Sequence, residues 1–190
     1  MTSRLGVVPR PPKRLARIAA EYLAHDWPAV RLAVPRNGRC QCGGSCTEAH
    51  LLDGEPIRTS VEAEQGWGEF EIAFTTHLFE VLDLPAHPGV ALNAALTNRC
   101  PTAVARPGRR FDTLLEPGPV RWHFYLSPGS VDAEKVTRVG GRLYHGPDDW
   151  IAAPPSRTPA TGRVRWNVHP MQTQWRTHGV TSIFDTLGIA

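Results

Sequence analysis

The chain has 190 residues, enough for one domain with a hydrophobic core that folds without help from a disulfide or a metal. Its 17 glycines and 18 prolines disfavour a helix bundle and favour a loop-rich α+β or mostly β fold. A hydrophobic content of 41% excludes wholesale disorder, and no apolar run approaches the ~18 residues that span a bilayer. The basic N-terminus lacks the apolar stretch of a signal peptide, so we expect a soluble, cytoplasmic protein without a membrane partner.

The formal charge of +3 is too small to indicate nucleic-acid binding by itself, but the cations are unusual in kind. Only Lys13 and Lys135 are lysines, and every other basic residue is arginine. Planar guanidinium groups suit phosphate recognition, whereas a GC-rich genome would enrich arginine without any functional reason, so both explanations stay open. Two groups are candidates for a basic face: Arg106, Arg109 and Arg110, and Arg157, Arg163 and Arg165.

Helices are expected at several points along the chain. Residues 1–12 contain three prolines and are predicted to form a loose arm before a single domain at 13–190. Apolar residues at helical spacing predict an amphipathic helix over Lys13–His25, which ends before Trp27-Pro28 because the residue preceding a proline resists the helical conformation. Shorter helices are predicted at 89–96, 131–136 and 181–187.

Alternation of apolar and polar residues, or short apolar runs, predict the strands. They are expected at 29–34, 69–74, 78–84, 120–126, 150–153 and 164–168. Residues 53–68 are predicted to be irregular because glycine and proline recur there. Strands and helices are interspersed without a strict βαβ rhythm, so the expected architecture is α+β, with a mixed sheet flanked by helices.

Three of the four cysteines lie close together, Cys40, Cys42 and Cys46, and His50 follows. Disulfides between such near neighbours would be strained. Zinc prefers four thiolate or imidazole ligands, and C-x-C-x3-C-x3-H supplies such a set, although C-x-C is shorter than the usual spacing. We predict a structural zinc in the loop at 38–50, with His50 as the fourth ligand unless it faces solvent. The alternative is three reduced cysteines on a flexible loop.

Three segments, taken in order, resemble the bifunctional DNA primase/polymerase (prim-pol) domain of the archaeo-eukaryotic primase superfamily, in the short divergent form common in actinobacteria. Residues 19–35 (AAEYLAHDWPAVRLAVP) are similar to its opening helix and strand, and residues 38–50 to the cysteine-rich insert of many bacterial members. Residues 148–166 (DDWIAAPPSRTPATGRVRW) are similar to its Ala-Pro-Pro-Ser strand and loop. The resemblance covers residues 13–170 and implies a prim-pol type fold with the zinc loop inserted.

The resemblance also implies a site for nucleotidyl transfer, in which carboxylates hold two divalent cations beside a triphosphate. Asp83 matches the first of these acids, and His123 matches the histidine that contacts the incoming nucleotide. Pro85 stands where the second acid is expected, and Arg121 replaces a serine. The third element, at 142–146, has no acid. Asp83 as a strand-end cap and His123 as a core histidine are the structural alternatives.

One aspartate cannot hold two hard cations against water, because Mg²⁺ needs several well-placed oxygen ligands. We therefore expect a prim-pol fold with an impaired catalytic site that still binds DNA or a nucleoside triphosphate. The residues expected to contact phosphate are Arg121, His123, Arg157 and Arg163.

Two other functions stay open. An active primase or polymerase would use Mg²⁺ or Mn²⁺ with Glu80, Asp148 or Asp149 as rearranged acids. A zinc-stabilised protein-interaction or regulatory module would have abandoned nucleic acid altogether. A helicase or another replication protein, if one takes part, is expected to be a separate chain.

Overall fold

The computed structural model describes residues 13–54, 56–99, 102–108 and 120–179. The predicted arm at 1–12, the predicted helix at 181–187, Arg109 and Arg110 lie outside these ranges. The helices are α1 (Arg14–Ala24), α2 (Ser60–Gly66), α3 (Ala86–Arg99), α4 (Ala133–Arg138) and the 3-10 helix η1 (Pro170–Thr173). The strands are β1 (Ala29–Ala33), β2 (Pro35–Arg36), β3 (Arg39–Cys40), β4 (His50–Leu51), β5 (Glu71–Pro85), β6 (Val104–Arg106), β7 (Arg121–Leu126), β8 (Arg142–Ala152), β9 (Arg157–Thr158), β10 (Gly162–Arg163) and β11 (Arg165–Val168).

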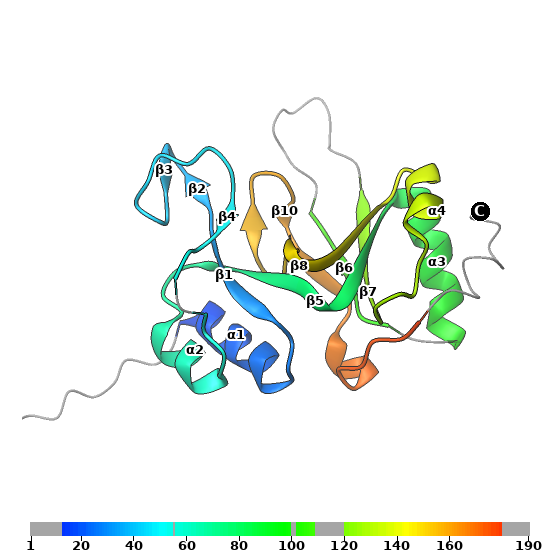
Figure 1. The fold of residues 1–190 in the computed structure, drawn as a ribbon, viewed down its shortest axis with the longest axis horizontal. Coiled ribbons are helices and arrows are strands. Elements are labelled where there is room, and N and C mark those ends of the chain that lie inside the picture. Colours follow the sequence, from blue (N-terminus) through cyan, green and yellow to red (C-terminus); the bar gives the residue numbers. More distant parts are fainter. Residues whose placement is uncertain (1–12, 55, 100–101, 109–119, 180–190) are drawn as a thin grey trace, which may run out of the picture.

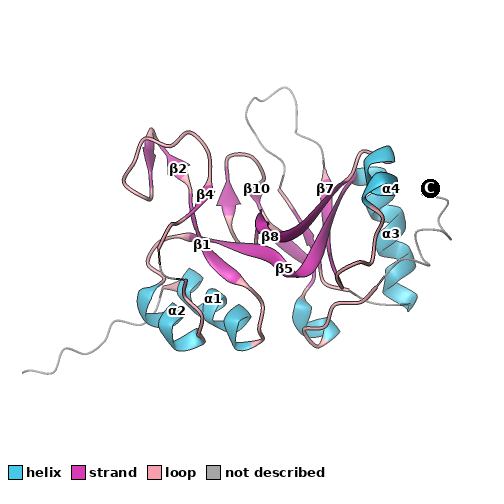
Figure 2. Cartoon of the chain, in the orientation of Figure 1, coloured by secondary structure: helices cyan, strands magenta, loops and turns pink. Residues whose placement is uncertain are grey.

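A seven-stranded sheet in the order β11-β6-β7-β5-β1-β4, with β8 also paired to β5, forms the centre of the fold. Helices flank it, α1 and α2 towards one end of the molecule and α3 and α4 towards the other (Figures 1 and 2). The α+β class is confirmed. The mixed sheet is wrong for the described strands, because every ladder between them is antiparallel and the one parallel contact is an isolated bridge from Leu126 to His178.

Strand β5 organises this sheet. The sequence predicts two strands, 69–74 and 78–84, but the chain runs as one strand of 15 residues. Its first residues lie between β1 and β8, and its last residues lie between β7 and β8. The polar interruption at Thr75 and Thr76 does not end the strand, because β8 shifts register there and continues. This shift leaves 147–149 unpaired inside β8.

Alternating side chains of the sheet build two cores, one on each face. Val81, Tyr125 and Ala105 belong to the core that contains α1 and α2. The residues next to them in sequence belong to the core that contains α3 and α4: Leu82, Phe124 and Val104. Both faces are therefore buried along the central strands, which explains their nearly continuous apolar sequence.

Helix α2 corrects the prediction that 53–68 is irregular. Thr59 caps it, since its hydroxyl accepts from the Glu62 N–H at 3.2 Å and the Glu62 carboxylate accepts from the Thr59 N–H at 3.2 Å. This reciprocal pair is a capping box, and T-x-x-E is its sequence signature. The signal was present at Thr59 and Glu62 but lay among glycine and proline residues.

The Pro-Pro-Ser corner fixes the β9–β10 hairpin against the start of β5. Ser156 is fully buried, and its hydroxyl accepts from the Ile72 N–H at 2.7 Å and donates to the Ile72 carbonyl at 2.8 Å. The Ser156 side chain thus makes hydrogen bonds with the Ile72 backbone of the kind that a neighbouring strand would make. This contact fixes the position of the hairpin, which was expected only as a loop.

Replacing Ser156 by Ala removes both hydrogen bonds and leaves a buried N–H without that partner. We expect the free energy of unfolding, measured by urea denaturation, to fall by about 1–3 kcal/mol. The exposed Ser45 provides the matched control, and Ser45→Ala is expected to change the free energy by less than about 0.5 kcal/mol. Equal effects at both positions would contradict the role given to Ser156.

Candidate functional site

The cysteine-rich loop begins at a tight hairpin between β2 and β3. Asn37 and Gly38 both have positive φ, 51° and 77°, as a two-residue type I′ turn requires. The turn returns the chain so that Cys40, at the end of β3, is buried with 5% exposure. The Asn-Gly pair is a strong hairpin signal that the sequence analysis did not use.

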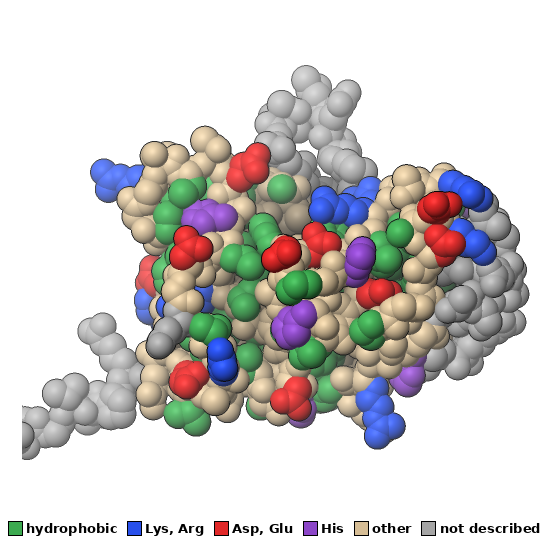
Figure 3. Space-filling model, viewed as in Figure 1, with side chains coloured by type: hydrophobic (Ala, Val, Ile, Leu, Met, Phe, Trp, Pro, Cys, Tyr) green, Lys and Arg blue, Asp and Glu red, His purple; other side chains and the backbone are tan. Residues whose placement is uncertain are grey.

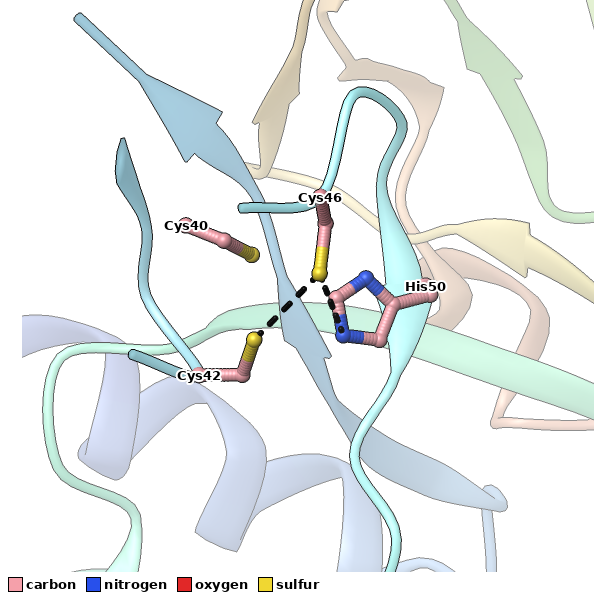
Figure 4. Close-up of side chains that lie close together, drawn as sticks. All are labelled: Cys40, Cys42, Cys46 and His50. Carbon is pink, nitrogen blue, oxygen red and sulfur yellow. Dashed lines mark hydrogen bonds between the residues drawn. The ribbon is translucent and has the colours of Figure 1, made fainter. Parts of the chain in front are cut away.

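The four expected ligands converge (Figure 4). One ligand atom from each of them, Cys40, Cys42, Cys46 and His50, lies within 4.8 Å of the others. The Sγ atoms of Cys42 and Cys46 are 3.5 Å apart, and Cys46 Sγ is 3.8 Å from His50 Nε2. Around a tetrahedral ion with metal–sulfur bonds of about 2.3 Å, ligand atoms stand about 3.8 Å apart. The four side chains therefore form a preformed metal-binding set.

Hydrogen bonds orient two of these ligands before any metal arrives. His50 Nδ1 lies 3.3 Å from the Glu48 carbonyl, which can only accept, so Nδ1 carries the proton and Nε2 keeps its lone pair for a metal. The Gly44 N–H donates to Cys42 Sγ at 3.4 Å and lowers the pKa of that thiol to about 7. The hydrogen bond with Cys42 raises the pKa of Cys46 to about 11, but a bound cation would deprotonate both thiols.

The second predicted site lies where β5, β7 and β8 run side by side. Asp83 is directly opposite His123 on β7 and Arg142 on β8. Arg121 Nε donates to Asp83 Oδ1 at 2.7 Å, and its Nη2 donates to the carbonyls of Asp83 and Gly140 at 3.3 and 3.4 Å. Asp83 is 6% exposed, so its carboxylate is an internal partner of Arg121 rather than a strand-end cap.

The other candidate acids do not join Asp83. Glu80 accepts from the backbone N–H groups of Gly129 and Ser130, at 2.8 and 3.2 Å, and so holds the turn after β7. Asp149 accepts from the His145 N–H at 3.1 Å and lies 3.8 Å from Arg142. Within the described ranges, the Cys₃His cluster is the one group of three or more such side chains placed to share a metal ion.

His123 is buried beside Asp83, with 3% exposure and 3.6 Å between its Nε2 and Asp83 Oδ1. Burial lowers its pKa to about 4, although the Asp83 carboxylate opposes the shift, so the ring is neutral at pH 7. Its Nδ1 has no hydrogen-bond partner, which a fully satisfied core histidine would have. The neighbouring side chains of Arg121 and Arg142 are more exposed, at 28% and 62%.

Two adjoining cavities gather the arginines. The first arginine pocket, of about 580 Å³, lies between the start of α1, strand β2 and the β9–β10 hairpin. Its charged residues are Arg14, Arg36, Glu71, Arg157 and Arg163. The second arginine pocket, of about 340 Å³, lies where β6, β10 and β11 meet, and its charged residues are Arg106, Arg163 and Arg165. Arg163 lines both pockets, and four of the six arginines predicted for a basic face are thereby brought together.

These arginines repeatedly stand opposite one another in antiparallel strands. Arg157 pairs with Arg163, Arg106 pairs with Arg165, and Arg36 pairs with Arg39. Like charges directly opposite each other destabilise a strand pair. Sequence reasoning missed Arg14 and Arg36 because only the folded hairpins bring them to the same cavity as Arg157.

A third cavity, of about 600 Å³, has the opposite character. It lies between the cysteine loop, β8 and the β9–β10 hairpin, and its acids are Glu48, Asp148 and Asp149. Arg142 also lines it and lies over the Tyr144 ring at 4.3 Å. Acidic and histidine side chains gather over β5 and β8 in the middle of the face drawn in Figure 3. This cavity shares Thr158 and Pro159 with the first arginine pocket, so the acidic and the basic cavity meet at the β9–β10 hairpin.

Comparison of the chain with models of known protein families, with curated proteins and with solved structures finds no match. Among the described residues, no helix is long and apolar enough to cross a membrane.

The pKa of His123 predicts an acid sensitivity of the fold. Because the pKa is about 6.5 unfolded and about 4 folded, the stability that neutral His123 contributes is complete above pH 6.5 and is lost as the pH falls towards 4. We expect the free energy of unfolding to drop by about 2 kcal/mol from pH 7 to pH 5 through this group. His123→Gln should flatten that change, and the exposed His87→Gln should not. Identical pH slopes in wild type and His123→Gln would contradict the assignment.

Proposed function

We propose that this chain is a zinc-stabilised nucleic-acid-binding domain of the primase/polymerase type that does not carry out metal-dependent nucleotidyl transfer. The observation that supports the binding function best is the set of arginines that face one another across strand pairs and line two adjoining cavities. We call this set the arginine surface: Arg14, Arg36, Arg106, Arg157, Arg163 and Arg165.

A polyanion is the ligand that this surface suits. Of the described residues that line the two pockets, Glu71 is the sole acid, and its carboxylate is 6% exposed and hydrogen-bonded to Arg36. The remaining guanidinium groups repel one another, and a row of phosphates would remove that repulsion while releasing counterions. DNA, RNA and nucleoside triphosphates share this chemistry, and the resemblance to primase/polymerase domains favours DNA among them.

The Asp83–Arg121 ion pair supports the absence of two-metal chemistry. A guanidinium already donates to Asp83 Oδ1 at 2.7 Å and so competes with any cation for this carboxylate. Mg²⁺ loses its water reluctantly and needs further oxygens, but Glu80 is engaged with Gly129 and Ser130. Arg121 itself remains part-exposed and available to a phosphate at this position.

Zinc fits the Cys₃His set and has a structural part in this proposal. Four protein ligands leave no open coordination position for substrate, so the ion would brace the loop and take no part in catalysis. The loop begins with the hairpin that carries Arg36 and ends with 47–49, which border the acidic cavity. Bound zinc would therefore hold in place one wall of the first arginine pocket and one wall of the acidic cavity.

Metal analysis tests the zinc assignment. We expect one zinc per chain, and its removal by a chelator should lower the melting temperature by roughly 5 °C, corresponding to about 2 kcal/mol for a chain of this size. Cys46→Ser and His50→Asn should lose the metal, whereas the exposed His87→Asn should keep it. Full zinc content in Cys46→Ser would exclude the proposed ligand set.

Nucleic-acid binding is tested at Arg163, which lines both arginine pockets. We expect wild-type affinity for a single strand to fall steeply with salt, and Arg163→Gln to weaken binding about tenfold and reduce the logarithmic salt slope by about 0.7. Arg17→Gln, an exposed arginine on α1 outside both pockets, is the matched control and should bind as wild type does.

Three outcomes would contradict the proposal. If the affinity does not change with salt concentration, or if Arg17→Gln and Arg163→Gln lose affinity equally, the arginine surface is not the binding site. Primer extension with Mg²⁺ or Mn²⁺ that disappears in Asp83→Ala would establish a working polymerase instead.

A further inference from the structure

The first arginine pocket differs from the second in shape and in charge. Its volume of about 580 Å³ is in the range of small-ligand sites, which run from about 300 to 1,000 Å³. Its walls come from three separate parts of the chain, namely the start of α1, the turn after β2 and the β9–β10 hairpin. A site of this volume can hold a phosphate group or a nucleotide.

Four guanidinium groups line this one cavity, those of Arg14, Arg36, Arg157 and Arg163. Arg36 is engaged with Glu71, which is the one carboxylate among the described lining residues. Arg14, Arg157 and Arg163 have no ion pair with any acid in the described part of the chain. Three uncompensated positive charges therefore surround the cavity.

The backbone beneath these arginines is held firmly. Ser156 ties the hairpin to Ile72, and the Thr158 hydroxyl accepts from the Thr161 N–H at 3.0 Å inside the hairpin turn. Arg157 and Arg163 stand directly opposite each other, so the hairpin cannot separate their like charges by sliding. A bridging anion is the simple means of relieving that repulsion.

One internal phosphodiester carries a single negative charge and cannot balance three uncompensated arginines. A terminal phosphate has a second pKa near 6 and carries about two negative charges at neutral pH, and a di- or triphosphate carries more. Its several oxygens also accept paired hydrogen bonds from guanidinium groups, which a diester offers less well.

We infer that the first arginine pocket binds a phosphate group with at least two negative charges, either the phosphorylated end of a strand or the oligophosphate tail of a nucleotide. This inference rests on the proposed function, because it divides the arginine surface into an end-binding pocket and a second pocket that follows the strand. Both ligands present a multiply charged phosphate, and the experiment distinguishes the strand end from the nucleotide tail.

Inorganic tripolyphosphate is the first probe, titrated calorimetrically at constant ionic strength. We expect one binding site per chain in wild type, weakened about tenfold by Arg157→Gln because one bidentate partner is lost. Arg17→Gln is the matched control, since Arg17 is exposed on α1 and lines neither pocket, and it should bind the probe as wild type does. Equal weakening by the two variants, or no binding in wild type, would overturn the inference.

Strands of identical sequence, ending in a phosphate or in a hydroxyl, are the second probe, with a nucleoside triphosphate beside them. About tenfold tighter binding of the phosphorylated strand, abolished by Arg157→Gln, identifies a strand end as the source. Binding of the triphosphate at this pocket without any end preference identifies the nucleotide tail. If hydroxyl-ended strands bind but neither phosphate probe does, the pocket inference fails and nucleic-acid binding stands. If tripolyphosphate binds and no strand does, nucleic-acid binding fails and the pocket stands.

Discussion

The pairing of β5 with three strands at once is the constraint on which the rest of the molecule depends. Because its side chains alternate between two buried cores, a slip of one residue would exchange Val81 and Leu82 between them and disrupt both. The register that satisfies the cores also places Asp83 opposite His123 and Arg142. The geometry around Asp83 is therefore set by apolar packing and needs no bound metal.

Acidic and basic side chains are distributed unequally between the interior and the surface of the molecule. The buried carboxylates among the described residues are those of Glu71, Glu80 and Asp83, and each accepts from an internal donor. Many of the arginines are left at the surface, where hairpins set them against one another. A net charge of only +3 thus conceals a local excess of positive charge. The buried acids are thus occupied by internal donors, whereas Arg14, Arg157 and Arg163 have no ion pair with an acid in the described part of the chain.

Local patterns were the part of the fold that the sequence could predict. Helical spacing located α1, and the Cys-x-Cys-x3-Cys-x3-His spacing identified all four members of the metal-binding set. Two misses were local signals that were not used, the capping box of Thr59 and Glu62 and the Asn37-Gly38 turn. The other misses depended on partners distant in the chain. The continuity of β5 depends on the register shift of β8, and the short strand β6 is fixed by its pairing with β7 and β11. Arg14 reaches the pocket of Arg157 only through the fold.

We propose that Arg121 takes the place beside Asp83 that a catalytic cation would need. A titration of the zinc-loaded protein with Mn²⁺, followed by the relaxation of water protons, tests this in wild type and in Asp83→Asn. The account predicts that the two proteins give the same weak response, since no acid joins Asp83 in the described structure. A stoichiometric Mn²⁺ site in wild type that Asp83→Asn abolishes would contradict it.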